Sequence, residues 1–237
     1  MNIAMIIAGG SGNRMHQDIP KQFLTVNEKP VIIYTLEVFQ RHPAIDAITV
    51  VCIEGWEKVL WAYVKQFNLA KVTAIVKGGD CGQNSIYRGL KEIRKNHDLE
   101  DIVLVHDAIR PMVSEEIISD CINKTVEFGS GIAVIPCAEA MLVSENEEDS
   151  AQLFNRNHLK RTQTPQGFRV GRLLELHERA LIQGITNSTA SCTLMIEMGE
   201  EVHFSKGSEK NLKLTTVEDI DIFKALLLAK RAEWLKD

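Results

Sequence analysis

Short apolar runs alternate along the chain with longer segments in which apolar residues recur at helical spacing. The apolar runs, at residues 3–8, 47–53, 72–76, 102–106 and 132–136, are rich in β-branched residues and have the length of buried strands. The segments between them predict helices at 30–40, 55–67, 84–95 and 115–127, the first opened by a proline in its first turn. Continuous apolar strands separated by helices favour an α/β fold, with a Rossmann-like, mostly parallel sheet covered by helices on both faces.

The alternation breaks after the fifth predicted strand. Residues 137–165 are polar and irregular and contain an acidic run at 145–149, which predicts an exposed arm or hairpin. Helical spacing returns at 170–181 and 188–198, followed by a strand near 201–205 and a last helix at 217–234. We therefore expect one domain over residues 1–237 that carries an arm at about 137–165.

Composition narrows the classes of function. A chain of 237 residues that is 45% hydrophobic can bury a full core. A formal net charge of -5 argues against nucleic-acid binding, which relies on clustered Lys and Arg, so we expect small-molecule partners. No apolar run approaches the roughly 18 residues that cross a bilayer and the first residues show no cleavable signal, so no membrane association and a cytoplasmic location are expected. The five scattered cysteines show no metal-binding spacing and are interpreted as buried or unreactive thiols.

A glycine-rich loop follows the first predicted strand directly and reads Ala8-Gly9-Gly10-Ser11-Gly12-Asn13-Arg14-Met15. Three glycines in four positions let several backbone N–H groups approach one anion. The loop lacks the third glycine of the dinucleotide fingerprint and the G-K-[ST] of a P-loop. A tight turn would explain the glycines alone, but Arg14 in the loop and Lys21 just beyond it add two cations, which match a triphosphate or pyrophosphate.

Five blocks of sequence resemble one enzyme family, in that family's order. A-G-G-x-G-x-R-M followed by P-K-Q is similar to the opening of sugar-phosphate nucleotidyltransferases, and among them of cytidylyltransferases that act on methylerythritol phosphate or ribitol phosphate. The other blocks are Gly78-Gly79 with Ser85, H-D-A-I-R-P at 106–111, Arg156 with Q-T-P-Q at 163–166, and N-L-K-L-T at 211–215. The resemblance covers nearly the whole chain. It implies transfer of CMP from CTP to a small polyol phosphate with release of pyrophosphate.

The resemblance also implies roles for individual residues. The acceptor's phosphate is an anionic nucleophile that needs no general base, so positioning and charge neutralisation carry the catalysis. Catalytic roles fall to Arg14, Lys21 and Lys213. Nucleotide binding falls to Ala8, Gly9, Gly10, Gly12, Gly79, Ser85 and Asp107, and acceptor binding to Glu139, Arg156, Thr164 and Thr189. Asp107 ends a predicted strand, where ligands sit in open α/β sheets, and is also expected to hold Mg²⁺.

Simpler interpretations exist for three of the charged residues. The position of Asp107 alone fits a capping or turn carboxylate, and Lys213 alone fits an ordinary solvated lysine. Arg110, next to Pro111, fits a structural ion-pair partner better than a catalyst.

Departures from the family pattern concern mainly the acceptor. Gly82 stands where an arginine is usual, and Ala140 and Ala190 stand where the family carries polar acceptor-binding groups. An altered acceptor or reduced activity is therefore expected. Cys192 and Ile109 resemble the ribitol phosphate branch, so D-ribitol 5-phosphate is the expected acceptor and CDP-ribitol the product. The alternative is a 2-C-methyl-D-erythritol 4-phosphate cytidylyltransferase of isoprenoid precursor synthesis.

Two other classes stay open. The same departures allow a non-catalytic relative that only binds nucleotide. A Rossmann-type oxidoreductase would need an acidic residue after the second strand, where Glu54 stands, but the first loop lacks the third glycine. The resemblance further implies a homodimer, since relatives exchange an arm like residues 137–165, and a polar arm of this length is not expected to be ordered alone.

Overall fold

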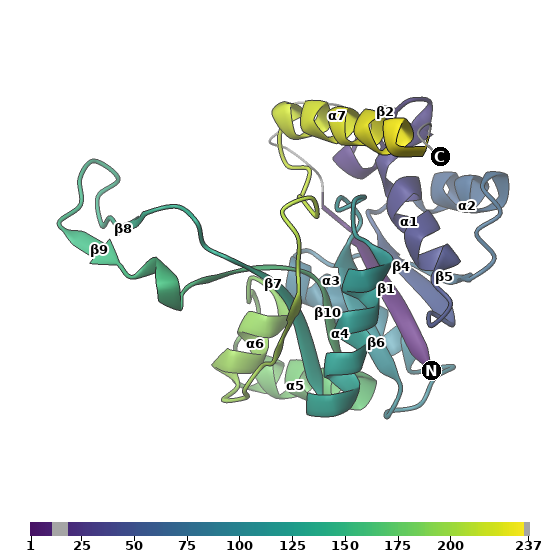
Figure 1. Cartoon of the computed structure of the whole chain (residues 1–237). Coiled ribbons are helices and arrows are strands. Elements are labelled where there is room, and N and C mark those ends of the chain that lie inside the picture. Colours follow the sequence, from purple (N-terminus) through teal and green to yellow (C-terminus); the bar gives the residue numbers. More distant parts are fainter. Residues whose placement is uncertain (11–18, 235–237) are drawn as a thin grey trace.

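A seven-stranded sheet forms the centre of the protein in a computed structural model that describes residues 1–10 and 19–234 (Figure 1). Its strands lie in the order β11-β7-β10-β6-β1-β4-β5. Only β10 runs antiparallel to its two neighbours, β6 and β7. The strands are β1 (Asn2–Ala8), β4 (Ala47–Cys52), β5 (Val72–Lys77), β6 (Ile102–Asp107), β7 (Ser130–Pro136), β10 (Lys160–Arg169) and β11 (Phe204–Lys206). The predicted α/β fold with a mostly parallel sheet is confirmed.

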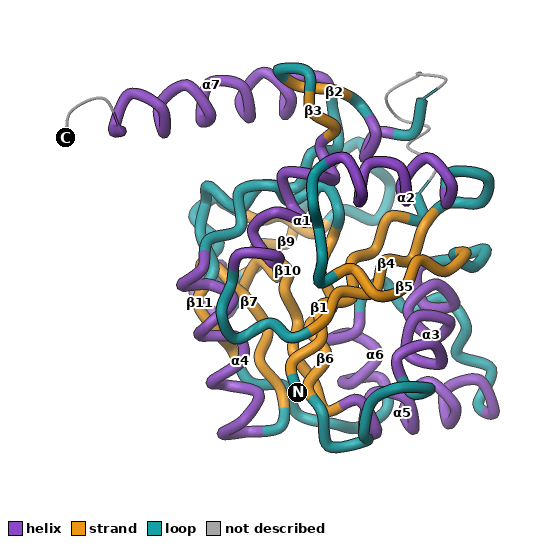
Figure 2. The backbone as a smooth tube through the Cα atoms, turned by 90° about the vertical axis from the view of Figure 1, so that its right-hand side faces the viewer, coloured by secondary structure: helices purple, strands orange, loops and turns teal. Residues whose placement is uncertain are grey.

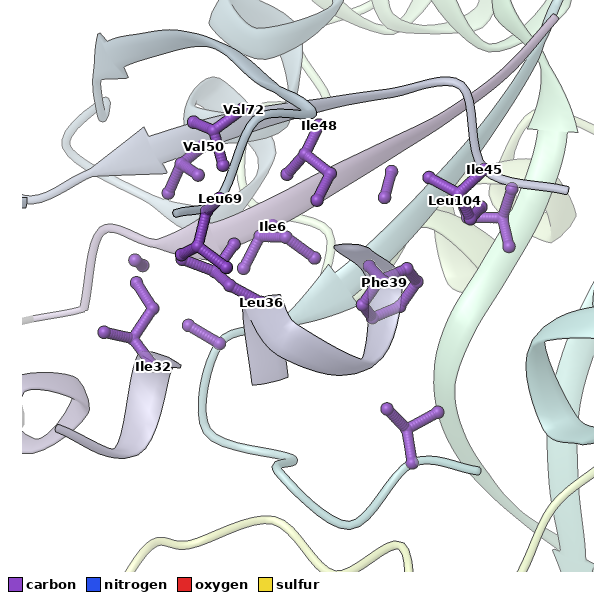
Figure 3. Close-up of a cluster of buried hydrophobic side chains, with 14 of the residues drawn as sticks. Ile6, Ile32, Leu36, Phe39, Ile45, Ile48, Val50, Leu69, Val72 and Leu104 are labelled. Carbon is purple, nitrogen blue, oxygen red and sulfur yellow. The ribbon is translucent and has the colours of Figure 1, made fainter. Parts of the chain in front are cut away.

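Helices cover both faces of this sheet, as predicted. One face carries α1 (Val31–Arg41), α2 (Glu57–Gln66) and α4 (Glu115–Phe128), and the other carries α3 (Gly82–Ile93), α5 (Val170–Ile182) and α6 (Ser191–Glu197). Because side chains alternate across a strand, β1 supplies Ala4 and Ile6 to the first core and Ile3 and Met5 to the second. Figure 3 shows the first core, where Leu36 and its neighbours on α1 pack beside side chains of the sheet.

A third, smaller cluster packs the last helix against the start of α1 and the short strand β2 (Thr25–Val26). Phe223 of α7 (Val217–Trp234) is buried against Leu214 and against Val26 of β2, which pairs with β3 (Lys29–Pro30). The Asp219 carboxylate accepts the backbone N–H groups of Thr215 and Thr216 and so caps the first turn of α7. Beyond this cluster, α7 extends away from the body of the molecule (Figure 2). Cap and cluster together fix the segment just before α7.

The expected arm is present but ends earlier than predicted. Residues 160–169 form β10, between β6 and β7 in the sheet, so the limit at residue 165 is wrong. The strand lacks an apolar pattern because two of its buried residues are the polar Gln163 and Gln166. Their side chains are hydrogen-bonded, which offsets the free-energy cost of burying them. What projects is the antiparallel pair β8 (Met141–Val143) and β9 (Gln152–Phe154) with its connections (Figure 1).

Smaller differences concern element ends and short elements. Pro30 caps α1 rather than occupying its first turn. The sixth helix is shorter than predicted, the late strand lies at 204–206, and the 3-10 helix η2 (Lys21–Phe23) was not predicted. No helix in the described part of the chain is both long enough and apolar enough to cross a bilayer.

Candidate active site

A cleft of about 640 Å³ opens at the carboxyl ends of β1 and β6, which is where open α/β sheets bind ligands. It is lined by segments from both ends of the chain. The sequence-predicted residues that line it are Ala8, Gly9, Gly10, Lys21, Gly79, Ser85, Asp107, Thr164, Thr189 and Lys213. Arg14 and Gly12 lie outside the described residues. Most of the residues predicted from the sequence therefore meet in one place.

Two glycine segments approach each other closely at one side of the cleft. The Ser85 hydroxyl accepts the backbone N–H of Gly79 at 3.0 Å. A Cβ on Gly79 would lie 2.5 Å from the Asn84 Cβ, and one on Gly9 would lie 3.3 Å from the Ser85 Oγ. Larger residues would push these segments apart, so glycine is needed here for close packing between β1 and α3.

Gln22 is hydrogen-bonded to the start of the glycine-rich loop. Its buried amide donates to the carbonyl oxygens of Ala8 at 2.7 Å and Gly10 at 3.1 Å. This places the neighbouring Lys21, at the start of η2, on the cleft wall. This role of Gln22 was not predicted, although the residue stands in the P-K-Q motif that indicated the site.

Asp107 lies between two cations. Its Oδ2 accepts the Arg110 Nε at 3.0 Å, and its Oδ1 accepts the Lys213 Nζ at 3.2 Å. Burial raises the pKa of the carboxyl, but the charges of Lys213 and Arg110 outweigh it and hold the pKa of Asp107 below its ordinary value. The carboxylate is thus ionised at neutral pH. The prediction that Arg110 is an ion-pair partner is confirmed.

His106 and Thr164 form a hydrogen-bonded chain that supports the backbone of Asp107. Burial lowers the pKa of His106 to about 4, so the ring is neutral. Its Nε2 lies 3.2 Å from the Arg110 carbonyl oxygen, which can only accept, so Nε2 carries the proton and Nδ1 accepts from the Thr164 hydroxyl at 3.1 Å. The same hydroxyl accepts the Asp107 N–H at 3.0 Å. Thr164 therefore lines the cleft, but most of its hydrogen-bonding capacity is used within the fold.

Two buried amides anchor the segment that carries Lys213. The Asn211 Nδ2 donates to the Thr164 carbonyl at 2.9 Å and to the Gln163 Oε1 at 3.2 Å. Arg110 donates to the Asn211 carbonyl at 2.8 Å, and the Gln163 Oε1 also accepts the Ser208 N–H at 3.1 Å. Gln163 and Asn211 stand in the recognised motifs, but no role was predicted for them. Their partners lie 45 to 101 residues away in the sequence, so only the fold shows that they position Lys213.

Two predicted acceptor-binding residues, Arg156 and Glu139, do not reach this cleft. Both lie on the arm, which projects away from the body of their own chain (Figure 1). Arg156 donates to the Ala138 carbonyl, and Glu139 lies 3.9 Å from the Arg161 guanidinium. Neither residue lines the cleft of its own chain, and their placement beside the acceptor stays a prediction.

His177 of α5 also lines the cleft, although it was not among the predicted site residues. Burial lowers its pKa from 6.5 to about 4, so the ring is neutral in the folded protein at neutral pH. The unfolded chain binds a proton near pH 6.5. The stability that depends on the neutral ring is therefore complete above about pH 6.5 and is lost as the pH falls toward 4.

We expect this buried histidine to make folding pH-dependent. Between pH 6.5 and 4 its contribution to the free energy of unfolding should fall by on the order of 3 kcal/mol, which the His177→Phe variant should not show. Urea unfolding of both proteins at pH 7, 6 and 5 measures the difference. Equal pH dependence in the two proteins would show that His177 is protonated as easily in the folded state as in the unfolded chain.

Comparison with known proteins agrees with this geometry. The family model of 2-C-methyl-D-erythritol 4-phosphate cytidylyltransferase (IspD) matches residues 2–229. A ribitol-5-phosphate cytidylyltransferase of Lacticaseibacillus paracasei is 41% identical over 97% of this chain and 99% of that protein. A 2-C-methyl-D-erythritol 4-phosphate cytidylyltransferase of Clostridium botulinum is 34% identical over 95% and 97%.

The fold has solved counterparts. The crystal structure of the 4-diphosphocytidyl-2C-methyl-D-erythritol synthase from Anaerococcus prevotii superimposes with a TM-score of 0.80 at 26% identity, over 96% of this chain and 98% of that one. The resemblance stated from the motifs is confirmed. The chain therefore belongs to the IspD family of cytidylyltransferases, which are nucleotidyltransferase enzymes.

Proposed function

We propose that the protein transfers CMP from CTP to D-ribitol 5-phosphate, forming CDP-ribitol and pyrophosphate. The observation that carries the proposal is that Lys21, Asp107 and Lys213 line one cleft beside the glycine segments. The choice of acceptor is supported by the relatives, because the ribitol-5-phosphate enzyme is 41% identical and the methylerythritol enzyme 34%. Both substrates are charged and do not cross membranes unaided, so we place the enzyme with them in the cytoplasm.

The proposed reaction needs charge neutralisation rather than a base. A phosphate oxygen of the acceptor attacks the α-phosphorus of CTP, the bond from that phosphorus to the bridging oxygen breaks, and pyrophosphate leaves with the electron pair. Lys213 is proposed to neutralise the α-phosphate, and Lys21 and Arg14 the leaving pyrophosphate. His106 is neutral, and its two ring nitrogens have partners within the fold, which fits a mechanism without a general base.

The site also fits Mg²⁺ bound mainly by substrate phosphates. No group of three or more His, Cys, Asp or Glu residues that could hold a metal occurs within the described residues. Mg²⁺ in nucleotide sites commonly uses one or two carboxylates besides the phosphates. Asp107 is ionised, and its Oδ1 accepts from the half-exposed Lys213, so this oxygen would hold the ion. Bound there, Mg²⁺ would supply positive charge to the phosphates.

Pyrophosphate release tests the proposed chemistry. With CTP, Mg²⁺ and D-ribitol 5-phosphate we expect steady release and a product with the mass of CDP-ribitol, and we expect EDTA to stop it. ATP, GTP and UTP at the same concentration serve as matched nucleotide controls. Tight CTP binding without turnover of any polyol phosphate would contradict the proposal and indicate a non-catalytic relative.

A methylerythritol acceptor is the second candidate. It is favoured by the matching family model and by the solved structures, which carry that activity in their descriptions. The same assay with 2-C-methyl-D-erythritol 4-phosphate in place of ribitol 5-phosphate compares the two acceptors directly.

We further propose that the arm forms a homodimer. An isolated two-stranded hairpin is marginally stable in water, so a partner surface is expected to support it. The arm leaves five apolar side chains in solvent, namely Met141, Leu142, Val143, Leu153 and Phe154. A clustered apolar surface of this kind is typical of an interface. In such a dimer the arm could bring Arg156 and Glu139 to the cleft of the other copy.

One substitution on the arm should dissociate the proposed homodimer into monomers. Leu153 is 78% exposed, so Leu153→Asp should leave the fold intact and shift the sedimentation mass at micromolar concentration from dimer to monomer. Ile182→Asp is the matched control, because Ile182 is 86% exposed on α5, away from the arm. A monomeric wild-type protein would contradict the proposed dimer.

A further inference from the structure

One wall of the cleft carries no charge. The lining residues contributed by α5, α6 and the segment between them are His177, Ser188, Thr189, Ala190, Ser191 and Leu194. His177 is neutral at pH 7 because burial lowers its pKa to about 4. Among the described residues, the charged ones that line the cleft all come from other segments and are Lys21, Asp80, Asp107, Arg110 and Lys213. Phosphate groups therefore have cationic partners elsewhere in the cleft and none on this wall.

Several polar groups around this wall already have partners. The Gln83 Nε2 donates to the Ile185 carbonyl at 2.7 Å, and its Oε1 accepts the Ser188 N–H at 2.8 Å. The hydroxyls of Ser188 and Thr193 lie 2.8 Å apart and form a hydrogen bond. These contacts fix the segment that leads into α6.

Two side chains on the same wall are different. The His177 Nε2 and the Ser191 Oγ are buried and have no hydrogen-bond partner among the described residues. The exposed fractions of His177 and Ser191 are only 1% and 2%. An unpaired buried polar group costs about 1–3 kcal/mol. Of the six such groups among the described residues, only those of His177 and Ser191 line the cleft. Two of them lining one cleft indicate a ligand that completes their hydrogen bonds.

We propose that His177 and Ser191 form a hydrogen-bonding subsite for the neutral part of a substrate, either the polyol chain of the acceptor or the nucleoside of CTP. The inference rests on the proposed function. A neutral imidazole and a serine hydroxyl can each donate or accept, which suits sugar and polyol hydroxyls and the edge of a base. Tyr87 lies nearly parallel to the His177 ring, with centroids 6.0 Å apart, and helps to hold its orientation. Ala190, beside Ser191, has no polar side chain to compete for the ligand.

Ser191→Ala and His177→Phe test the subsite. Each substitution removes a buried group that has no partner in the free protein, so at pH 7 the unfolding midpoint should stay the same or rise. The KM of one substrate should rise about tenfold, as expected for a lost hydrogen bond of about 1 kcal/mol or slightly more, while the KM of the other stays unchanged. A rise for the acceptor assigns the subsite to the polyol, and a rise for CTP assigns it to the nucleoside.

Matched controls come from outside the cleft. Ser205→Ala and His203→Phe make the same changes at a buried serine of β11 and at a half-buried histidine that stacks on Phe128, and neither residue lines the cleft. Both should leave KM and kcat unchanged.

Two results would overturn the inference. One is unchanged KM values for both substrates in active Ser191→Ala and His177→Phe variants, which leaves the proposed function standing. The other is a result of binding measurements, which are needed if the wild-type protein shows no turnover and the proposed function itself fails. Calorimetric titration of the same variants with CTP and with ribitol 5-phosphate then replaces the kinetics, and wild-type affinity for both compounds would exclude the subsite.

Discussion

Lys213→Ala is expected to lower kcat about a hundredfold while leaving the protein folded. The side chain is 42% exposed and contributes little packing, whereas its Nζ lies 3.2 Å from the Asp107 Oδ1 in the cleft. Losing one electrostatic contact to the transition state typically costs on the order of 3 kcal/mol, which corresponds to about a hundredfold in rate. The backbone position should persist, because Asn211 and Leu214 anchor the segment independently of the lysine side chain.

Steady-state kinetics with saturating CTP and acceptor, together with a urea unfolding curve, measure both parts of this prediction. Lys206→Ala is the control, because Lys206 is an exposed lysine paired with Glu116 at 2.8 Å and does not line the cleft. Its kcat should equal that of the wild type. A Lys213→Ala variant with normal kcat and normal stability would remove Lys213 from the mechanism.

Lys21→Ala and Arg14→Ala are each expected to lower kcat by a similar factor, about a hundredfold. Lys21 lines the cleft next to Gln22, whose amide fixes the glycine-rich loop. The prediction for Arg14 rests on the sequence, because this residue lies outside the described part of the chain. Since both cations are proposed to neutralise charge that builds on the leaving pyrophosphate, kcat should fall more than the affinity for CTP.

Lys29→Ala provides a nearby comparison. Lys29 pairs with Glu37 at 2.7 Å and does not line the cleft, so its loss should affect stability slightly and leave kcat unchanged. If Lys21→Ala instead raises the KM for CTP with kcat intact, Lys21 binds substrate and transition state equally and contributes no rate enhancement.

The sequence predicted those parts of the fold that depend on apolar periodicity. The strands that became β1, β4, β5, β6 and β7 are β-branched runs, and the pattern located them to within two residues at each end. Strand β10 was missed because its buried amides are stabilised by partners from distant segments, for which a local pattern contains no signal. The arm was recognised by its polarity, but its end could not be located without β10.

In the candidate site, the sequence motifs identified the charged residues proposed to contact the phosphates. They did not identify the buried polar residues around them. Lys21, Asp107 and Lys213 were predicted and meet in the cleft, because their motifs lie at the ends of strands or just beyond them. His177, Ser191 and Gln163 lie in segments whose relation to the cleft depends on how α5, α6 and β10 pack. Arg156 and Glu139 lie on the arm, which projects outward, so they do not line the cleft of their own chain and their role at the acceptor stays a prediction.

A competition between acceptors tests the central claim most directly. D-Ribitol 5-phosphate and 2-C-methyl-D-erythritol 4-phosphate are mixed at equal concentration with saturating CTP and Mg²⁺, and the two CDP products are separated and quantified early in the reaction. Their ratio equals the ratio of the two kcat/KM values. We predict at least about a tenfold excess of CDP-ribitol, a difference of about 1.4 kcal/mol in transition-state binding. An excess of the methylerythritol product, or no product from any pentitol phosphate, would contradict the assignment of ribitol 5-phosphate as the acceptor.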